Sequence, residues 1–331
     1  MLGRVFEEEI CSQPALWARI AASNKAYDLA RAVSDRDVVL LGSGSSLFVG
    51  QLGALALRRR GIRASALAAS EAPFDNGAYK HCAVIALSQS GRSTDLLNAL
   101  DVLKPSRLVA LTNSADSPLA QRADVVIDVE AGPEIAVPAS KSVTAMAAIL
   151  LWTAAIASGK SARNAKTLNQ TAEDVSDWLS GDAVAELGEA ARHLVSKRSI
   201  IVVGTGYGLP VANEIALKFK EASYMHAEGF AAGEFRHGST ALLDPACAVL
   251  GIVDDASRAT VNKPLADAVQ TESLRYVIGG HIGELPLLGP IVDEAFNTLA
   301  WLVTGQMLTL MVGRARYVES DAPRGLTKVM I

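Results

Sequence analysis

The chain alternates short apolar runs with glycine- and serine-rich turns and with longer stretches of helical periodicity. DVVLLGSGSS at 37–46 is an apolar run that ends in glycine and serine, and the helical pattern FVGQLGALALRRR follows it. CAVIALSQSGRSTDLLNAL at 82–100 repeats this order, and RLVALTN and ADVVIDV are two further apolar runs. Short buried strands that alternate with helices predict βαβ units and a parallel sheet.

The same pattern starts again in the second half of the chain. RSIIVVGTGYGLPVANEIALK at 198–218 repeats the strand, G-x-G turn and helix found at 37–57. CAVLGIVDDASRAT at 247–260 resembles CAVIALSQSGRST at 82–94. This internal similarity predicts two copies of one α/β unit.

A polar connector, SGKSARNAKTLNQTAEDVSDWLSGDA, separates the two copies, and we place the boundary near residue 165. The predicted domains are 1–165, a helical arm with the first α/β unit, and 166–331, a linker helix with the second unit and a C-terminal tail. The tail, ESDAPRGLTKVMI, contains Asp, Pro, Arg and Gly, and we expect it to be irregular.

Composition narrows the class of protein. Of the 331 residues, 50% are hydrophobic and 20% are charged, and the formal net charge is -4, which fits a globular protein and gives no basic surface for nucleic acid. The longest apolar run, SVTAMAAILLWTAAIAS, is short for a membrane span and is predicted to be a buried helix. The scattered cysteines form no CxxC pair, and no cluster has the spacing of metal ligands. We therefore expect a cytoplasmic protein without a metal.

Two of the turns are rich in serine, GSGSS at 42–46 and SQSGRST at 88–94. Loops at the carboxyl ends of parallel strands form the ligand crevice, and the next helix N-terminus offers N–H groups with partial positive charge. Serine hydroxyls add neutral donors, so the turns suit a phosphate group; helix capping is the alternative. GSGSSL and GTGYGL match the dinucleotide fingerprint only in part and the P-loop is absent, so no cofactor is expected.

The stretch EIALKFKEASYMHAEGFAAGEFRHG at 214–238 concentrates acidic, basic and histidine residues. It is predicted to begin as a helix, because no Gly or Pro interrupts it before Gly229. On a helix Glu214, Lys218 and Glu221 stand at i, i+4 and i+7 and share one face. That face is either a solvated ladder of salt bridges or a surface for proton transfer.

Four segments together resemble one family. LSQSGRSTD, AGPEIAVPASKSVT, EIALKFKEASYMHAEGFAAGEFRHG and DAPRGLTK closely resemble the isomerase half of the glutamine–fructose-6-phosphate amidotransferases, which consists of two SIS (sugar isomerase) domains. SQSG-x-[ST] alone would identify only a SIS domain, whereas the long block with the tail lysine is more specific. The resemblance implies an α/β fold of two tandem SIS domains, each with a parallel five-stranded sheet flanked by helices in a flavodoxin-like, three-layer arrangement.

The resemblance also implies a site. The residues that match the family's phosphate-binding hydroxyls and amide are Ser46, Ser88, Gln89, Ser90 and Ser93. Glu221 matches the base that moves a proton between C1 and C2 of the open-chain sugar. Glu214 and Lys218 match neighbours that position this base and contact the sugar.

Three further residues complete the implied site. His237 matches the histidine assigned to ring opening, which the family delivers from the second subunit of a homodimer. Lys328 matches the tail lysine that closes over the site and can condense with a keto sugar. Val137 stands where a backbone group of the family touches the substrate. Nearby, Ala139 departs from the family's residues, which leaves the identity of the sugar open.

The implied chemistry is consistent with the residue types. Aldose–ketose interconversion needs an anion anchor, an acid or base that opens the ring, and a carboxylate that moves a proton through an enediol or enolamine. A lysine amine can form an imine with a carbonyl group. These requirements are met without a metal ion.

The family's synthases begin with a glutaminase domain, whereas this chain begins Met1-Leu2 and is expected to have no such domain. We therefore expect a glucosamine-6-phosphate deaminase/isomerase that releases ammonia and gives fructose 6-phosphate. Open alternatives are a plain aldose–ketose phosphosugar isomerase, a fructosamine-phosphate deglycase and, from another class, a sugar-phosphate sensor. A sensor would need the serine turns but not the acid–base residues. The expected partners are a sugar phosphate and a second copy of the chain, not nucleic acid or a membrane.

Overall fold

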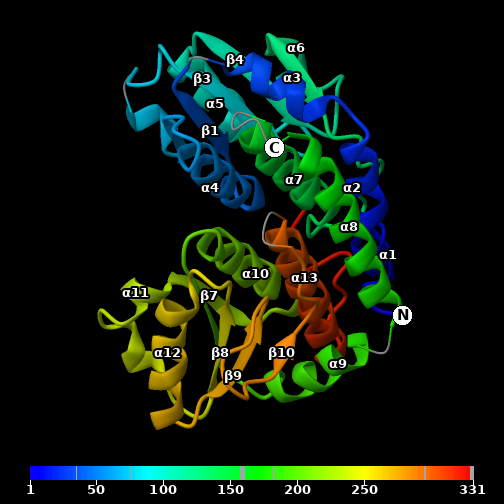
Figure 1. Cartoon of the computed structure of the whole chain (residues 1–331), viewed down its shortest axis with the longest axis vertical. Helices are drawn as coiled ribbons and strands as arrows, with labels where there is room; N and C mark the ends of the chain where they lie inside the picture. The colour runs from blue at the N-terminus through cyan, green and yellow to red at the C-terminus, as the bar shows by residue number, and fades with distance from the viewer. Residues whose placement is uncertain (35, 76, 157–160, 182, 294–295, 329–331) are drawn as a thin grey trace. The chain divides into compact units, whose positions relative to one another are not determined.

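The computed structural model describes residues 1–34, 36–75, 77–156, 161–181, 183–293 and 296–328 (Figure 1). The chain forms two compact units, each with one sheet. The N-sheet unit consists of Ala15–Glu134, Lys141–Asn169 and Thr327–Ile331, and the C-sheet unit consists of Met1–Pro14, Ile135–Ser140 and Gln170–Leu326. The boundary predicted near residue 165 falls inside α8 (Ser161–Ser180) and stays a prediction.

The N-sheet unit contains a parallel five-stranded sheet in the order β2-β1-β3-β4-β5. Its strands are β1 (Val38–Gly42), β2 (Ala64–Ala68), β3 (Ala83–Ser88), β4 (Arg107–Thr112) and β5 (Val125–Asp128). Its helices are α3 (Lys25–Ala32), α4 (Ser45–Arg58), η1 (Ala72–Asp75), α5 (Thr94–Leu103), α6 (Pro118–Arg122) and α7 (Lys141–Ile156), while α2 (Gln13–Ala21) and α8 have residues in both units.

The C-sheet unit repeats this arrangement with the parallel order β10-β9-β8-β6-β7. Its strands are β6 (Ser199–Gly204), β7 (His226–Ala231), β8 (Cys247–Ile252), β9 (Leu274–Ile278) and β10 (Leu287–Leu288). Its helices are α1 (Arg4–Cys11), α9 (Ala183–Leu194), α10 (Gly208–Ser223), α11 (Ala232–Phe235), η2 (Ser239–Leu242), α12 (Arg258–Gln270) and α13 (Asn297–Ala315). Both strand orders follow the flavodoxin-like pattern 2-1-3-4-5, so the predicted fold of two similar parallel units is confirmed.

Each sheet is buried on both faces, which explains why its central strands are continuous apolar runs. In the N-sheet unit, Val84 and Ala86 of β3 pack in one cluster with Leu96 and Leu100 of α5. In the C-sheet unit, α11 and α12 cover one face of the sheet, while α10 and α13 pack together on the other (Figure 1). Each unit is therefore a three-layer α/β/α structure.

The longest apolar run of the sequence forms α7, a helix that is buried along nearly its whole length, as predicted. Gly53 of α4 permits close packing here, because a Cβ at this position would lie 2.8 Å from the side chain of Leu150 in α7. Among the residues that the structure describes, no helix combines the length and the hydropathy that crossing a membrane requires.

The helix predicted from residue 214 ends earlier than Gly229. α10 stops at Ser223 because Tyr224 adopts a left-handed conformation (φ 54), and the N–H of the next residue, Met225, donates to the carbonyl of Phe219. The chain then enters β7, an edge strand that carries His226. The tail after α13 contains neither helix nor strand up to residue 328, as expected.

Candidate functional site

The serine-rich turns follow β1 and β3, which are neighbours in the N-sheet unit. The chain leaves β1 for α4 and β3 for α5, and these two helices lie on opposite faces of the sheet. The two turns therefore diverge at the carboxyl ends of adjacent strands, which is where open α/β sheets form their ligand crevice. Two helix N-termini, those of α4 and α5, face this point with their partial positive charge.

The turn after β3 is shaped by its own hydroxyl groups. Ser88 Oγ accepts a hydrogen bond of 3.0 Å from the N–H of Gly91, and Ser90 Oγ accepts one of 3.2 Å from the N–H of Arg92. Gly91 is left-handed (φ 61), and a Cβ there would collide with the side chain of Ser117. A serine hydroxyl that accepts in this way keeps its own O–H as a donor. The turn thus presents hydroxyl donors on a fixed backbone.

The helix starts beside these turns do not use serine in the usual capping role. Ser93 is the N-cap of α5, yet among the described residues its side chain makes no capping hydrogen bond. Ser46 lies in the first turn of α4, whose N-cap is Gly44. Both serines are half-buried, as are Gln89 and Ser90, whereas Ser88 is buried. This pattern favours ligand binding over capping for Ser93.

The corresponding turn of the C-sheet unit has a different chemistry. After β8, Asp254 Oδ1 accepts a hydrogen bond of 2.7 Å from the N–H of Ser257, and Ser257 Oγ accepts one of 2.9 Å from the N–H of Asp254. Asp255 also lies in this turn, where it pairs with Arg258. Carboxylates at the start of α12 repel an anion, so the serine-lined crevice of the N-sheet unit is the candidate phosphate site.

α10 of the C-sheet unit carries a row of alternating charges. Lys218 Nζ lies 3.3 Å from Glu214 Oε1 and 2.5 Å from Glu221 Oε2. The side chains of Lys218 and Glu214 are only 1% and 2% exposed, whereas that of Glu221 is 21% exposed. The prediction that these three residues share one helix face is confirmed, and the face is buried rather than a solvated ladder. Glu221 is the one member of the row that reaches the surface.

Burial would lower the pKa of Lys218, but the two carboxylates outweigh this effect and raise the pKa well above its ordinary value of 10.5. Lys218 is therefore charged at neutral pH. A fixed ammonium group between two carboxylates compensates their charge in an environment that excludes water.

The tail connects the end of α10 to the segment that contains Val137. Ser320 Oγ donates a hydrogen bond of 2.8 Å to the carbonyl of Ala222, the residue after Glu221. The next carbonyl, that of Asp321, accepts a hydrogen bond of 2.9 Å from the N–H of Val137. Within the C-sheet unit, two consecutive tail residues thus hold Val137 near the end of the helix that carries Glu221.

Lys328 is held in the N-sheet unit. Its Nζ donates a hydrogen bond of 3.2 Å to Oε2 of Glu134, whose side chain is fully buried just before α7. The carbonyl of Gly132, two residues before Glu134, accepts a hydrogen bond of 2.8 Å from Asn113 Nδ2, and the N–H of Asn113 donates one of 3.2 Å to the carbonyl of Gln89. Asn113 and Gln89 directly follow β4 and β3, so the pair of Lys328 and Glu134 lies at the edge of the unit where the β3 turn begins.

His237 is exposed and follows α11, on the face of the C-sheet opposite to α10. Within this unit the structure does not bring His237 to Glu221. The family resemblance implies that this histidine acts in the site of a second subunit, and this stays a prediction.

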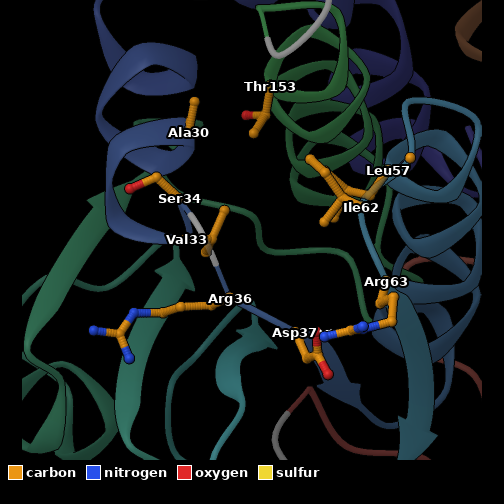
Figure 2. A pocket seen from close by; sticks show the side chains of 10 residues that line it. Ala30, Val33, Ser34, Arg36, Asp37, Leu57, Ile62, Arg63 and Thr153 are labelled. Atoms are coloured by element: carbon orange, nitrogen blue, oxygen red, sulfur yellow. Dashed lines mark hydrogen bonds and ion pairs between the residues drawn. The ribbon is translucent and has the colours of Figure 1, made fainter.

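A cavity of about 480 Å³ lies at the other end of the N-sheet, beside the amino-terminal ends of β1 and β2 (Figure 2). Its floor is apolar, and Asp37 and Arg63 point toward one another across its rim at 2.7 Å. Ligands of open α/β sheets bind at the carboxyl ends of strands, so this cavity is not the candidate site. Among the described residues, no cluster of three or more His, Cys, Asp or Glu side chains is arranged to bind a metal ion.

Sequence reasoning missed two buried carboxylates. Glu134 lies within the quoted segment AGPEIAVPASKSVT, and Glu9 of α1 accepts a hydrogen bond from the N–H of Ile135, at the start of the segment that contains Val137. Glu134 stands alone among mostly apolar residues, and Glu9 ends a run of three glutamates. Their partners are 194 and 126 positions away, so no local pattern revealed them.

Comparisons with known proteins identify relatives of this chain. A curated glutamine–fructose-6-phosphate aminotransferase (isomerizing) of Sulfolobus acidocaldarius is 31% identical over 306 residues, which cover 91% of this chain and 51% of that protein. The chain spans about half the length of the curated relatives it matches.

Two solved structures share the fold. The C-terminal domain of glucosamine-fructose-6-phosphate aminotransferase from Francisella tularensis superposes with a TM-score of 0.86 at 21% identity and covers 97% of this chain and 98% of that chain. Glucosamine-6-phosphate deaminase from Thermotoga maritima gives a TM-score of 0.83 at 22% identity, with 98% and 100% covered. The family model described as "SIS domain" matches residues 33–157 and 193–271, more than half of the chain. Two matched segments, two parallel sheets and a serine-lined crevice lead to one conclusion: the chain belongs to the SIS domain family.

Proposed function

We propose that this chain is a phosphosugar isomerase that acts on an amino sugar phosphate, glucosamine 6-phosphate, and releases ammonia and fructose 6-phosphate. The observation that carries the proposal is the charged row on α10, in which a buried ammonium group supports one carboxylate, Glu221, at the surface. A sensor has no need of such a row. The S. acidocaldarius relative is named as an isomerizing aminotransferase, and the similar T. maritima structure is a glucosamine-6-phosphate deaminase.

The phosphate group is assigned to the crevice between β1 and β3. Ser46, Ser90, Ser93 and Gln89 lie in the turns and helix starts that follow β1 and β3, and we assign their hydroxyl and amide donors to the phosphate. Ser88 fixes the turn through its hydrogen bond with Gly91. Neutral donors and helix dipoles bind a phosphate dianion without a lysine or a metal ion.

The proton transfer is assigned to Glu221. After the ring opens, with His237 of a second subunit as the proposed acid–base group, C1 is an aldehyde and C2 carries the amine and one hydrogen. The Glu221 carboxylate removes the C2 proton while O1 takes up a proton, which gives the enolamine. Glu221 then returns its proton to C1 while the C2 amine loses one. The product is a C2 imine with a C1 alcohol. A nucleophile adds at C2, ammonia leaves, and with water as the net reactant the ketose phosphate remains.

A direct test is incubation of the purified chain with glucosamine 6-phosphate, with ammonia and fructose 6-phosphate measured separately. We expect both products in equal amounts. Interconversion of glucose 6-phosphate and fructose 6-phosphate, without release of ammonia from the amino sugar, would indicate the plain isomerase. Release of an amine from a fructosamine phosphate alone would indicate the deglycase. Cytoplasmic location and the homodimer belong to the same proposal.

The first prediction concerns Glu221→Gln. Loss of the proton-transferring carboxylate should lower kcat by about 10² to 10⁴-fold while sugar phosphate still binds. The matched control is Lys220→Gln, an exposed position on the same helix, which should retain activity. Binding with full biological response in Glu221→Gln would instead support the sensor.

A further inference from the structure

We propose that Glu134 is the positioning residue for Lys328: it holds the tail lysine at the start of α7 and accepts its proton when the amine attacks C2 of the substrate. The inference rests on the proposed function, because it assigns to Lys328 the step in which ammonia leaves. Neither the sequence motifs nor the family resemblance gave Glu134 a role.

The Glu134 carboxylate has a fixed geometry. Its side chain is 0% exposed, and the first turn of α7 holds it, since Oε1 accepts a hydrogen bond of 3.0 Å from the N–H of Ser142 and Oε2 one of 2.8 Å from Ser142 Oγ. Oε2 also accepts from Lys328 Nζ at 3.2 Å. One carboxylate oxygen is therefore fixed by the helix and in contact with the lysine amine.

The two partners differ in their access to solvent. The Lys328 side chain is 21% exposed, so its amine can contact a ligand, whereas the Glu134 side chain is fully buried. Lys141, the first residue of α7, lies close by, because its Nζ donates to the carbonyl of Pro133, the residue before Glu134. A buried carboxylate needs a compensating positive charge, and Lys328 supplies one through a side chain that can move.

The position fits the chemistry. Asn113 ties the segment just before Glu134 to Gln89 of the β3 turn, so Lys328 is held at the edge where Ser46 and the β3 turn form the phosphate crevice. A lysine amine must lose a proton before it can act as a nucleophile. A fixed carboxylate oxygen in contact with Nζ is placed to take that proton.

The step balances as follows. The Lys328 ammonium group gives one proton to Glu134, and the amine lone pair forms a bond to C2 of the neutral ketimine left by the proton shift. The C2–nitrogen bond of the substrate then breaks. The departing nitrogen leaves as ammonia with the proton that Glu134 held and one from the lysine amine, and C2 keeps a protonated imine to Lys328. Water, the remaining reactant, hydrolyses this imine to the ketose phosphate and restores the lysine.

The test is borohydride trapping of the lysine imine. Fructose 6-phosphate and borohydride are added to the full chain, and the reduced adduct on Lys328 is quantified by mass spectrometry as a function of time and pH. We expect Glu134→Gln, which keeps an oxygen acceptor for Ser142, to slow adduct formation about 10²-fold near neutral pH. Raising the pH should restore much of the rate, because hydroxide can then deprotonate the amine. Half-saturation by fructose 6-phosphate should change little.

Glu130→Gln is the matched control, since Glu130 precedes Glu134 in the same loop but is 66% exposed and pairs with Lys25. The Glu130→Gln chain should form the reduced adduct on Lys328 at the wild-type rate. An unchanged rate and pH profile in Glu134→Gln overturns the inference, and so does a loss that high pH does not restore, since this indicates structural damage alone. Ammonia release by the wild-type chain without any adduct on Lys328 also rejects it and leaves the proposed deaminase intact. Absence of ammonia release rejects the deaminase itself.

Discussion

At the scale of single residues, the most unusual feature is a lysine side chain that is only 1% exposed in the middle of a helix. Lys218 is stable there because two carboxylates contact it, one buried and one at the surface. The three charges depend on one another, because removal of one partner leaves an uncompensated buried charge. The same contacts fix the rotamer of Glu221, the residue proposed to transfer the proton.

Replacement of Lys218 by methionine should lower the free energy of unfolding by about 3–5 kcal/mol, because it leaves two close carboxylates without their cation. The pKa of Lys218 in the folded state is raised above 10.5. The free energy of unfolding that its charge contributes is therefore fully present below this pH and is lost as the pH rises further. Urea unfolding of both chains between pH 7 and the alkaline range measures the difference. Lys220→Met, an exposed neighbour, should change stability by no more than about 0.5 kcal/mol; an equal loss in both variants would contradict the argument.

At the scale of elements, the tail fastens three distant segments of the C-sheet unit. The Asp321 carboxylate accepts hydrogen bonds from the N–H groups of Val5 and Phe6, at 3.0 and 2.7 Å, in the first turn of α1. Its carbonyl accepts from Val137, and the preceding Ser320 binds the end of α10. A short irregular arm therefore sets the positions of a helix start, a helix end and the segment between them.

Asp321→Ala should remove the cap of α1 and cost about 1–2 kcal/mol of stability. Hydrogen exchange should rise first at the amides of Val5 and Phe6, because these lose their acceptor. Asp321→Asn retains one carbonyl oxygen, so its stability and its hydrogen exchange at these amides should be intermediate between those of the wild type and Asp321→Ala. Equal exchange in all three chains would show that the carboxylate does not hold α1.

At the scale of the whole molecule, the proposed site needs groups that one chain does not assemble. His237 and Glu221 lie in opposite layers of the same unit, and the structure does not bring them together within it. If His237 acts in the partner's site, an isologous dimer contains two equivalent sites, each with residues from both chains.

Co-expression of His237→Ala and Glu221→Gln chains tests this arrangement. Each variant alone should be inactive, whereas random mixing should restore about a quarter of the wild-type sites, because half the dimers are mixed and each has one intact site. Ammonia release from the mixture, compared with the separate chains, is the measurement. No recovery in a mixture that forms mixed dimers would place His237 and Glu221 in one chain's site or remove His237 from the mechanism.

The sequence predicted much of this fold because its signals are local. Apolar runs such as that of β3 are long enough to indicate buried strands, and the spacing of Glu214, Lys218 and Glu221 alone placed them on one helix face. The sequence did not locate the end of α10, because a left-handed Tyr224 has no pattern that distinguishes it from a helical residue. The edge strand β7, with polar residues and a glycine, carries only a weak strand signal.

What the sequence determined by itself is the repeated order of strand, turn and helix, since the period of apolar residues and the glycines at turns act within a few positions. Only the tertiary structure decided that the charged face of α10 is buried, that Asp254 is hydrogen-bonded into the turn after β8, and that Glu134 contacts Lys328. Burial and pairing depend on which distant segments pack together. No spacing along the chain records that information.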